Sequence, residues 1–340
     1  MKIGGGKLSQ NPEHFASWQQ GHPVGPLTIE VGATYGCNHD CFHCGFQQYN
    51  PYGKKRNFLD KDAFLRFLVD FRALGGQEVY FAGNGEPLLN PHMAEWVKAG
   101  NELGIDMAMS SNGIPLTPKN ATQILPHMAW IRFSVNGGTV EDYVRVHKCK
   151  EKDFDILWKN LKFSARLKKE QNLKVNLALQ FIVYDLDWDS IEPMVERHLD
   201  AGTDLLIFRN VGKTDGSLSV IPDEVRERLK KAEGYDRVQV RWDTFAPPKQ
   251  SLNWTQCQAI HFKTNMDDRG NLVTCNRNLI KDSVYGNIHE QSFKEIWLES
   301  VKKKEVFQTV CSGADIPNCR QWCQVSYDND TIEKALSQLV

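Results

Sequence analysis

Three cysteines near the start of the chain have types and spacing suited to a metal site. Cys37, Cys41 and Cys44 are spaced C-x3-C-x2-C and follow an apolar run at residues 27–31. Structural zinc sites usually have four protein ligands, whereas a 4Fe-4S cluster held by three thiolates leaves one iron open to a substrate or cofactor. The spacing therefore favours an iron–sulfur cluster with an open iron. Zinc bound with the help of His39 and His43 is the alternative.

This cysteine motif resembles the signature of the radical S-adenosylmethionine (SAM) superfamily, in which the open iron binds the amino and carboxylate groups of SAM. Three further segments resemble motifs of that family and occur in the family's order. They are Gly83-Asn84-Gly85-Glu86-Pro87, similar to GGEP; Ser111-Asn112-Gly113, similar to TNG; and residues 132–137, similar to the S-x-D-G segment with Asn136 in place of Asp. The resemblance covers roughly residues 25–210.

The resemblance implies a set of SAM contacts. Without a Cβ, the backbone at Gly83 and Gly85 can approach a ligand closely, and Glu86 is expected to accept hydrogen bonds from the SAM amino group. Arg145 stands where the family often has an arginine that reaches the SAM carboxylate or ribose, and an ordinary surface helix is the alternative there. The full expected set is Gly83, Asn84, Gly85, Glu86, Asn112, Ser134 and Arg145.

A second group of five cysteines lies in the last 90 residues, and this tail resembles the auxiliary-cluster extension called SPASM or its shorter twitch form. The similar features are a tight-turn sequence at residues 268–271 before Cys275, the Gly286-Asn287-Ile288 segment and the helix pattern at 292–297. A full SPASM region needs more thiolates than five, so one auxiliary 4Fe-4S cluster is expected, with zinc on the same residues as the alternative. Its expected ligands are Cys257, Cys275, Cys319 and Cys323.

Cys311 is the remaining cysteine of the tail. We assign it as a catalytic residue that donates a hydrogen atom to a substrate radical, as the resemblance to family epimerases implies. The alternative is that Cys311 replaces Cys319 as the fourth cluster ligand. Cys149, between two lysines, is interpreted as an incidental thiol.

Alternating apolar strands and amphipathic helices must position these residues. Strands are expected at 28–31, 78–81, 106–110, 130–135, 175–183 and 205–209, and helices at 60–74, 91–103, 117–128, 153–169 and 189–201. Such repeated units predict a parallel sheet, and six of them predict an α/β fold of the open, partial (β/α)6 TIM-like barrel type. The active site of a parallel barrel forms at the carboxyl ends of its strands. The motif segments follow strands, so they are expected to face one cavity.

The expected domains are an N-terminal extension at 1–24, a radical SAM core at 25–212, a connecting segment at 213–250 and a small cysteine-rich domain at 251–340. The 41 basic and 42 acidic side chains nearly cancel, which gives no reason to expect a nucleic acid or a membrane surface as partner. The N-terminal residues lack the apolar segment of a signal peptide. We therefore expect a cytoplasmic protein with reduced thiols.

The resemblance implies reductive cleavage of SAM and abstraction of a substrate hydrogen atom by a 5'-deoxyadenosyl radical. Few residues precede Cys37, so an appended peptide-recognition domain is not expected there. This favours a dehydrogenase or epimerase of a small polar metabolite of sugar, aminocyclitol or nucleoside type. The auxiliary cluster would transfer electrons, and a flavodoxin- or ferredoxin-type protein would supply them. Modification of a peptide or protein side chain is the alternative, and a zinc-stabilised binding module is the non-enzymatic one.

Overall fold

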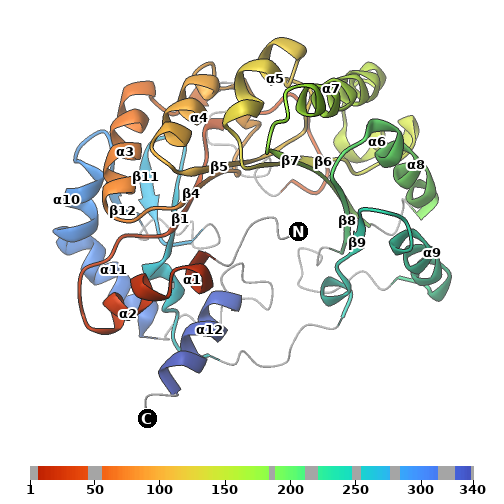
Figure 1. The fold of residues 1–340 in the computed structure, drawn as a ribbon. Helices are drawn as coiled ribbons and strands as arrows, with labels where there is room; N and C mark the ends of the chain where they lie inside the picture. The colour runs from red at the N-terminus through yellow and green to blue at the C-terminus, as the bar shows by residue number, and fades with distance from the viewer. Residues whose placement is uncertain are drawn as a thin grey trace.

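The computed structural model describes residues 7–44, 56–183, 188–210, 221–246, 254–275, 284–312 and 326–337. Ten strands form one curved sheet in the order β12-β11-β10-β1-β4-β5-β6-β7-β8-β9 (Figure 1). The strands from β10 through β1 to β9 are all parallel to one another. No helix in the described part of the chain is long and apolar enough to cross a membrane.

The six predicted strands are confirmed to within a residue or so at each end. Their bounds are β1 Thr28–Val31, β4 Glu78–Phe81, β5 Asp106–Ser111, β6 Trp130–Ser134, β7 Asn176–Ile182 and β8 Leu205–Arg209. Along β6, Ile131 and Phe133 are buried in the main hydrophobic core, whereas Arg132 and Ser134 are only partly buried. Because side chains alternate along a strand, Arg132 and Ser134 lie on the opposite, concave face of the sheet.

Helices cover the outer face of the curved sheet, as Figure 1 shows. The helix α3, Lys61–Ala73, buries four apolar side chains at the spacing of one helical face, namely Phe64, Phe67, Leu68 and Phe71. Asp60 caps this helix by accepting a hydrogen bond from the backbone N–H of Ala63 at 2.8 Å. The other helices of this layer are α4 Met93–Glu102, α5 Pro118–Ile124, α6 Val140–His147, α7 Glu151–Glu170, α8 Ile191–Ala201 and α9 Asp223–Glu233. The predicted α/β fold with a parallel sheet is confirmed.

The expected helix at 117–128 is shorter than the pattern suggested. It ends at Ile124 and continues as the single turn η3, Leu125–His127. Pro126 explains the change, because proline has no N–H to donate to the preceding helical turn. Short turns of the same kind are η2 Pro87–Leu89, η4 Trp188–Ser190, η5 Trp242–Thr244 and η6 Ala259–His261.

The C-terminal residues extend the same sheet rather than starting a new one. β10, Lys263–Met266, pairs in parallel with β1 from Thr28↔Lys263 to Val31↔Met266. β11, Asn271–Val273, and β12, Val284–Asn287, follow as antiparallel strands. The predicted hairpin before Cys275 is confirmed, and its turn is held by the Asp267 carboxylate, which accepts from the N–H groups of Arg269 and Asn271, each at 2.9 Å. The sheet also gains β9, Val238–Val240, at its far edge.

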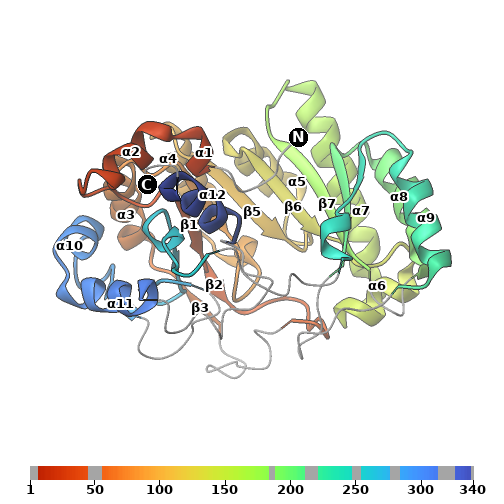
Figure 2. The ribbon, with the colours of Figure 1, turned by 90° about the horizontal axis from the view of Figure 1, so that it is seen from below.

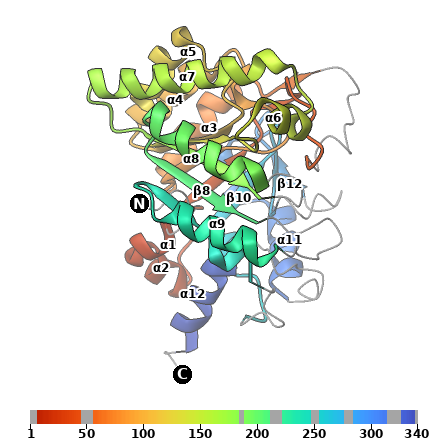
Figure 3. The ribbon, with the colours of Figure 1, turned by 90° about the vertical axis from the view of Figure 1, so that its right-hand side faces the viewer.

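Two further packing contacts tie the ends of the chain to the barrel. α10, Phe293–Leu298, lies beside α3, with the Phe67 and Phe293 ring centroids 4.8 Å apart. The helices α1 (Lys7–Gln10), α2 (Pro12–Gln19) and α12 (Ser326–Ser337) lie together on another side (Figures 2 and 3). They share a small second core built from Leu8, Leu27, Ala259, Phe262 and Ile332. α11, Val301–Cys311, follows α10.

Candidate functional site

The cysteine loop begins directly after the strands β1 and β2. β2, Thr34–Tyr35, pairs with β3, Asn57–Phe58, and Cys37 follows two residues later. The Cys44 N–H donates to the Cys41 carbonyl at 3.1 Å, which makes the second half of the motif a tight turn. Burial raises the pKa of both Cys37 and Cys41 above the usual thiol value. The charge of a neighbouring cysteine thiolate contributes to the rise in each case, so the motif thiols lie near one another.

The backbone at Gly36 lies in close contact with the backbone at Gly85. The two residues form a parallel bridge, and the Glu86 N–H donates to the Gly36 carbonyl at 3.0 Å. A Cβ at position 85 would lie 2.3 Å from the Gly36 oxygen, so only glycine fits without moving the backbone. This contact joins the cysteine loop to the loop after β4.

Glu86 is buried and connects this loop to the end of β5. Its Oε1 accepts hydrogen bonds from the Leu88 N–H at 3.1 Å and the Ser111 hydroxyl at 2.8 Å, and its Oε2 accepts from the Asn112 N–H at 2.7 Å. Burial raises the pKa of Glu86 to about 7, and these hydrogen bonds oppose the rise. The carboxylate thus braces two strand ends, a role that its motif resemblance did not indicate.

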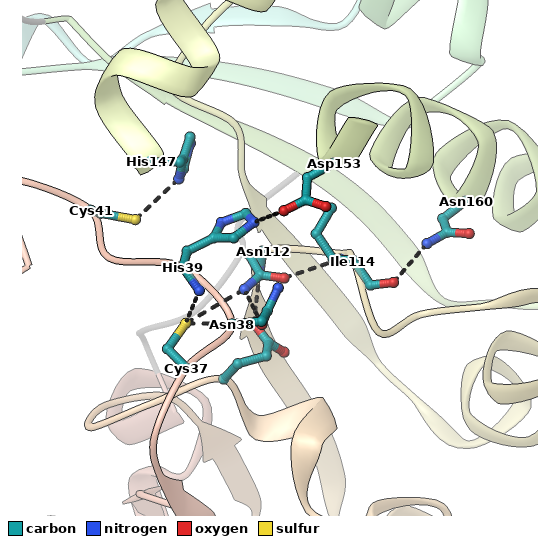
Figure 4. Close-up of polar contacts among 10 residues, drawn as sticks. Cys37, Asn38, His39, Cys41, Asn112, Ile114, His147, Asp153 and Asn160 are labelled. Carbon is teal, nitrogen blue, oxygen red and sulfur yellow. Dashed lines mark hydrogen bonds and ion pairs between the residues drawn. The ribbon is translucent and has the colours of Figure 1, made fainter. Parts of the chain in front are cut away.

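Asn112 connects the end of β5 to the cysteine loop (Figure 4). Its side-chain N–H group donates to the Asn38 side-chain oxygen at 2.8 Å and lies 3.6 Å from the Cys37 sulfur. Its own oxygen accepts from the Ile114 N–H at 3.0 Å, which fixes the amide orientation. The N–H of His39 also approaches the Cys37 sulfur, at 3.4 Å. Cys37 therefore lies among N–H donors, which suits a thiolate.

His147, at the end of α6, contacts the second cysteine of the motif. Its Nδ1 lies 3.1 Å from the Cys41 sulfur (Figure 4). Its Nε2 accepts a hydrogen bond from the Asn136 N–H at 3.1 Å. Burial lowers the pKa of His147 well below the usual value, so the ring is neutral and has one proton. Because Nε2 is an acceptor, that proton lies on Nδ1 and points to the Cys41 sulfur. The sequence analysis did not indicate this contact.

A histidine of the cysteine loop itself, His39, is also held by the protein. The His39 Nε2 lies 3.5 Å from a carboxylate oxygen of Asp153, at the start of α7 (Figure 4). Among the described residues, the ligand atoms of His39, Cys41 and His147 lie within 4.8 Å of one another, as do those of His39, Cys149 and Asp153. These sets are the competing donors for a zinc ion.

The other expected SAM contacts lie at different depths. Ser134 is the last residue of β6, on the concave face, and Asn84 is partly buried in the loop after β4. Arg145 lies on α6, where its side chain is about half exposed and pairs with Asp142 at 2.6 Å. Asn136, in place of Asp, is fully buried, and its oxygen accepts from the Ile182 N–H at 2.9 Å. Asn136 thus braces β7 against β6.

Three of the five tail cysteines lie in the described part of the chain. Cys257 is buried, and its sulfur accepts from the Asn329 side-chain N–H at 3.4 Å. Cys311 ends α11 and its thiol donates to the Cys257 carbonyl at 3.2 Å. Cys275 is partly buried after β11. The predicted ligands Cys319 and Cys323 lie outside the described residues.

The residues of the first site fit a metal cluster with an open position. Three thiols come from one loop at the carboxyl end of a parallel sheet, where two have N–H groups directed at their sulfurs. Soft thiolate ligands select iron–sulfur clusters or zinc. The Gly83 backbone has a φ of 111°, which glycine adopts without strain, and the loop approaches the cysteine loop closely. The arrangement is a loop-borne thiolate site suited to an iron–sulfur cluster, as the motif resemblance implies.

Comparison with known proteins agrees with this assignment. Residues 31–196 match the model of the radical SAM superfamily, so the chain contains a radical SAM superfamily domain. An AdoMet-dependent heme synthase of Methanosarcina barkeri is 26% identical over 121 residues, which are 35% of this chain and 33% of that protein. An S-adenosylmethionine-dependent nucleotide dehydratase of Flammeovirga pacifica is 29% identical over 102 residues, which are 29% of this chain and 35% of that protein. The chain thus spans about a third of the length of these relatives.

Solved structures show the same fold at low sequence identity. Streptococcus suis SuiB bound to its precursor peptide SuiA has a TM-score of 0.64 and 14% identity, covering 88% of this chain and 71% of SuiB. The structure of anSMEcpe with bound AdoMet has a TM-score of 0.58 and 17% identity, covering 88% of this chain and 85% of anSMEcpe. Both therefore have the curved α/β architecture seen here.

Replacing Gly85 with Ala tests the backbone contact that joins the two loops. The added Cβ would meet the Gly36 oxygen at 2.3 Å, so we expect the free energy of unfolding to fall by about 1–3 kcal/mol. Gly32→Ala is the matched control, because its nearest neighbours lie at 3.5 Å, and it should change stability by less than about 0.5 kcal/mol. Urea denaturation measures both, and equal stability of the two variants would contradict the contact.

Proposed function

We propose that this chain is a radical SAM enzyme in which Cys37, Cys41 and Cys44 hold a 4Fe-4S cluster and SAM binds beside it. One observation carries the proposal: two of the motif segments, residues 83–87 and 111–113, meet at the cysteine loop. Gly85 contacts Gly36, Glu86 binds the Asn112 backbone, and Asn112 reaches the Cys37 sulfur. A protein that used these cysteines only as a structural metal site would have no need of this convergence.

The protein's own residues would bind and orient the reactants. When bound, such a cluster supplies the electron that cleaves SAM to methionine and a 5'-deoxyadenosyl radical. The open backbone at Gly83 and Gly85 would receive the SAM amino acid part, with Asn84 beside it. Glu86 would act chiefly by holding Asn112 in place, because its oxygens accept protein hydrogen bonds. Ser134 and Arg145 would contact the ribose or carboxylate of SAM.

A small polar metabolite is the substrate class that we favour, with dehydrogenation or epimerisation at a carbinol carbon as the reaction. The two curated relatives support a small molecule, since their names specify heme synthesis and nucleotide dehydration. A reduced flavodoxin- or ferredoxin-type protein would supply the electron. Modification of a peptide is the second candidate, supported by the structure of SuiB with its precursor peptide.

The tail cysteines would form an auxiliary 4Fe-4S cluster of the twitch type. Cys257 and Cys275 would be ligands together with Cys319 and Cys323, and full thiolate ligation would suit the cluster to electron transfer. Cys311 would remain a thiol and act as the hydrogen donor. The hydrogen bond from Cys311 to the Cys257 carbonyl supports its position next to this cluster.

Replacing Cys37, Cys41 and Cys44 together with Ala should abolish SAM cleavage and remove about four irons per chain. The physical reason is the loss of all three thiolates that bind the first cluster. Cys149→Ala is the matched control, because Cys149 lies near Cys41 but is not part of the cysteine motif. This variant should keep its iron and its activity. Iron analysis and chromatography of 5'-deoxyadenosine measure both effects. SAM cleavage by the triple variant would contradict the assignment.

Cys257→Ala and Cys311→Ala separate a cluster ligand from a hydrogen donor. Cys257→Ala should lose up to about four irons per chain, because it removes a thiolate of the second cluster. Cys311→Ala should keep its iron, still cleave SAM and lose only substrate conversion. Loss of iron from Cys311→Ala would instead make Cys311 a ligand in place of Cys319.

His147→Phe removes the N–H that points to the Cys41 sulfur while keeping an aromatic ring. Hydrogen bonds to cluster sulfurs raise reduction potentials, so we expect a shift to more negative potential on the order of tens of millivolts. His147→Gln keeps an N–H donor and should shift less. Redox titration followed by electron paramagnetic resonance measures the change, and identical potentials in all three proteins would show that His147 does not act on the cluster.

A further inference from the structure

Two arginines on the concave face of the sheet have no carboxylate partner among the described residues. Arg132 lies on β6 between the buried Ile131 and Phe133, and Arg209 is the last residue of β8, after the buried Phe208. Strand alternation therefore directs both side chains away from the helices and into the barrel. Neither arginine forms an ion pair among the described residues, whereas five other described arginines do.

Arg132 is held in place by neutral groups only. Its Nε donates to the Ser110 hydroxyl at 3.1 Å, and its Nη2 donates to the Tyr80 hydroxyl at 2.5 Å. The Tyr80 and Ser110 hydroxyls are themselves 2.6 Å apart. These contacts fix the guanidinium without neutralising it, and they leave its Nη1 without a protein acceptor in the described part of the chain.

Arg209 has a guanidinium N–H that no described residue of the barrel accepts from. Its Nε is buried and has no hydrogen-bond acceptor among the described residues. Burial and the charges of Arg132 and Arg241 lower its pKa to about 10, so the guanidinium remains positive at neutral pH. The nearby carboxylate of Asp243 is already paired with Arg241 through two contacts, at 2.9 and 2.8 Å.

The acidic side chains on the same face have other partners. A carboxylate oxygen of Glu30 lies 3.8 Å from the Lys263 ammonium, and Glu78 accepts from the Trp130 indole N–H at 3.4 Å. Among the described residues of this face, two guanidiniums and only one carboxylate, that of Glu78, thus lack an ion-pair partner, which leaves an excess of positive charge. Leaving a buried charge without a partner is costly, so such a pair is expected where a ligand supplies the counter-charge.

We infer that Arg132 and Arg209 bind a phosphate group of the substrate inside the barrel. Two planar guanidiniums with N–H groups that no described residue accepts from supply the charge and the donors that a phosphate dianion requires. Ser134, a proposed SAM contact, lies two residues beyond Arg132 on the same face of β6, which is about 7 Å along a strand. The position would hold a phosphorylated small metabolite next to SAM. This inference rests on the proposed function for its substrate role, and it disfavours a neutral peptide side chain.

Calorimetric titration of the reconstituted full-length enzyme with inorganic phosphate tests the site directly. Arg132→Gln and Arg209→Gln each remove one guanidinium charge and should weaken phosphate binding at least about tenfold. Arg132→Lys keeps the charge but loses the planar fork, so it should bind with intermediate affinity. Arg166→Gln, on the exposed face of α7, is the charge-matched control and should bind phosphate as the wild type does.

Titration of the same proteins with SAM distinguishes the sources of the anion. Unchanged SAM affinity in both glutamine variants supports a substrate phosphate. Loss of SAM affinity, with phosphate competing against SAM, would mean that the arginines hold the SAM carboxylate and would overturn the inference. Phosphate binding that is absent from the wild type, or equal in all variants, would also overturn it.

Iron content and SAM cleavage are measured separately on these preparations. If the wild type binds phosphate through both arginines but does not cleave SAM, the proposed function fails while the phosphate site stands. If SAM is cleaved but phosphate does not bind, the proposed function stands and this inference fails.

Discussion

The close contact between the Gly36 and Gly85 backbones is the constraint on which the site depends. A parallel sheet brings the ends of β1 and β4 side by side, but side chains of ordinary size would keep the loops beyond them apart. With glycine at position 85, the Glu86 N–H bonds to the Gly36 carbonyl at 3.0 Å. Glu86 then reaches the end of β5, and Asn112 reaches back to the Cys37 sulfur. The cysteine loop is thus positioned by two neighbouring strands as well as by its own.

The other side of the cysteine loop is held by α6. The Asp40 and Phe42 N–H groups donate to the His147 and Val146 carbonyls at 3.1 and 3.2 Å, beside the contact between His147 and Cys41. These bonds use the free carbonyls at the end of a helix. Since the Asn136 N–H binds His147 in turn, the end of β6 also controls the orientation of the imidazole. The positions of the thiols are therefore set in part by contacts with the rest of the protein.

Much of the barrel could be predicted from the sequence, because its strands are short apolar runs and its helices have one apolar face. β1, β4 and β8 have the expected bounds, and the turn before Cys275 follows from its residue types. β10 could not be predicted, since Lys263–Met266 is largely polar and its pairing with β1 joins residues more than 200 positions apart. The motif resemblance named the site residues, yet the brace at Glu86 and the contact of His147 with Cys41 depend on how distant elements pack. That Arg132 and Arg209 have no carboxylate partner among the described residues likewise follows only from how distant elements pack.

The central claim is that the three-cysteine loop holds a cluster that cleaves SAM. Anaerobic reconstitution, followed by iron and sulfide analysis and by incubation with dithionite and SAM, tests it most directly. The account predicts about eight irons per chain, from two clusters of four, together with formation of 5'-deoxyadenosine. A colourless protein that binds zinc and leaves SAM intact would contradict it.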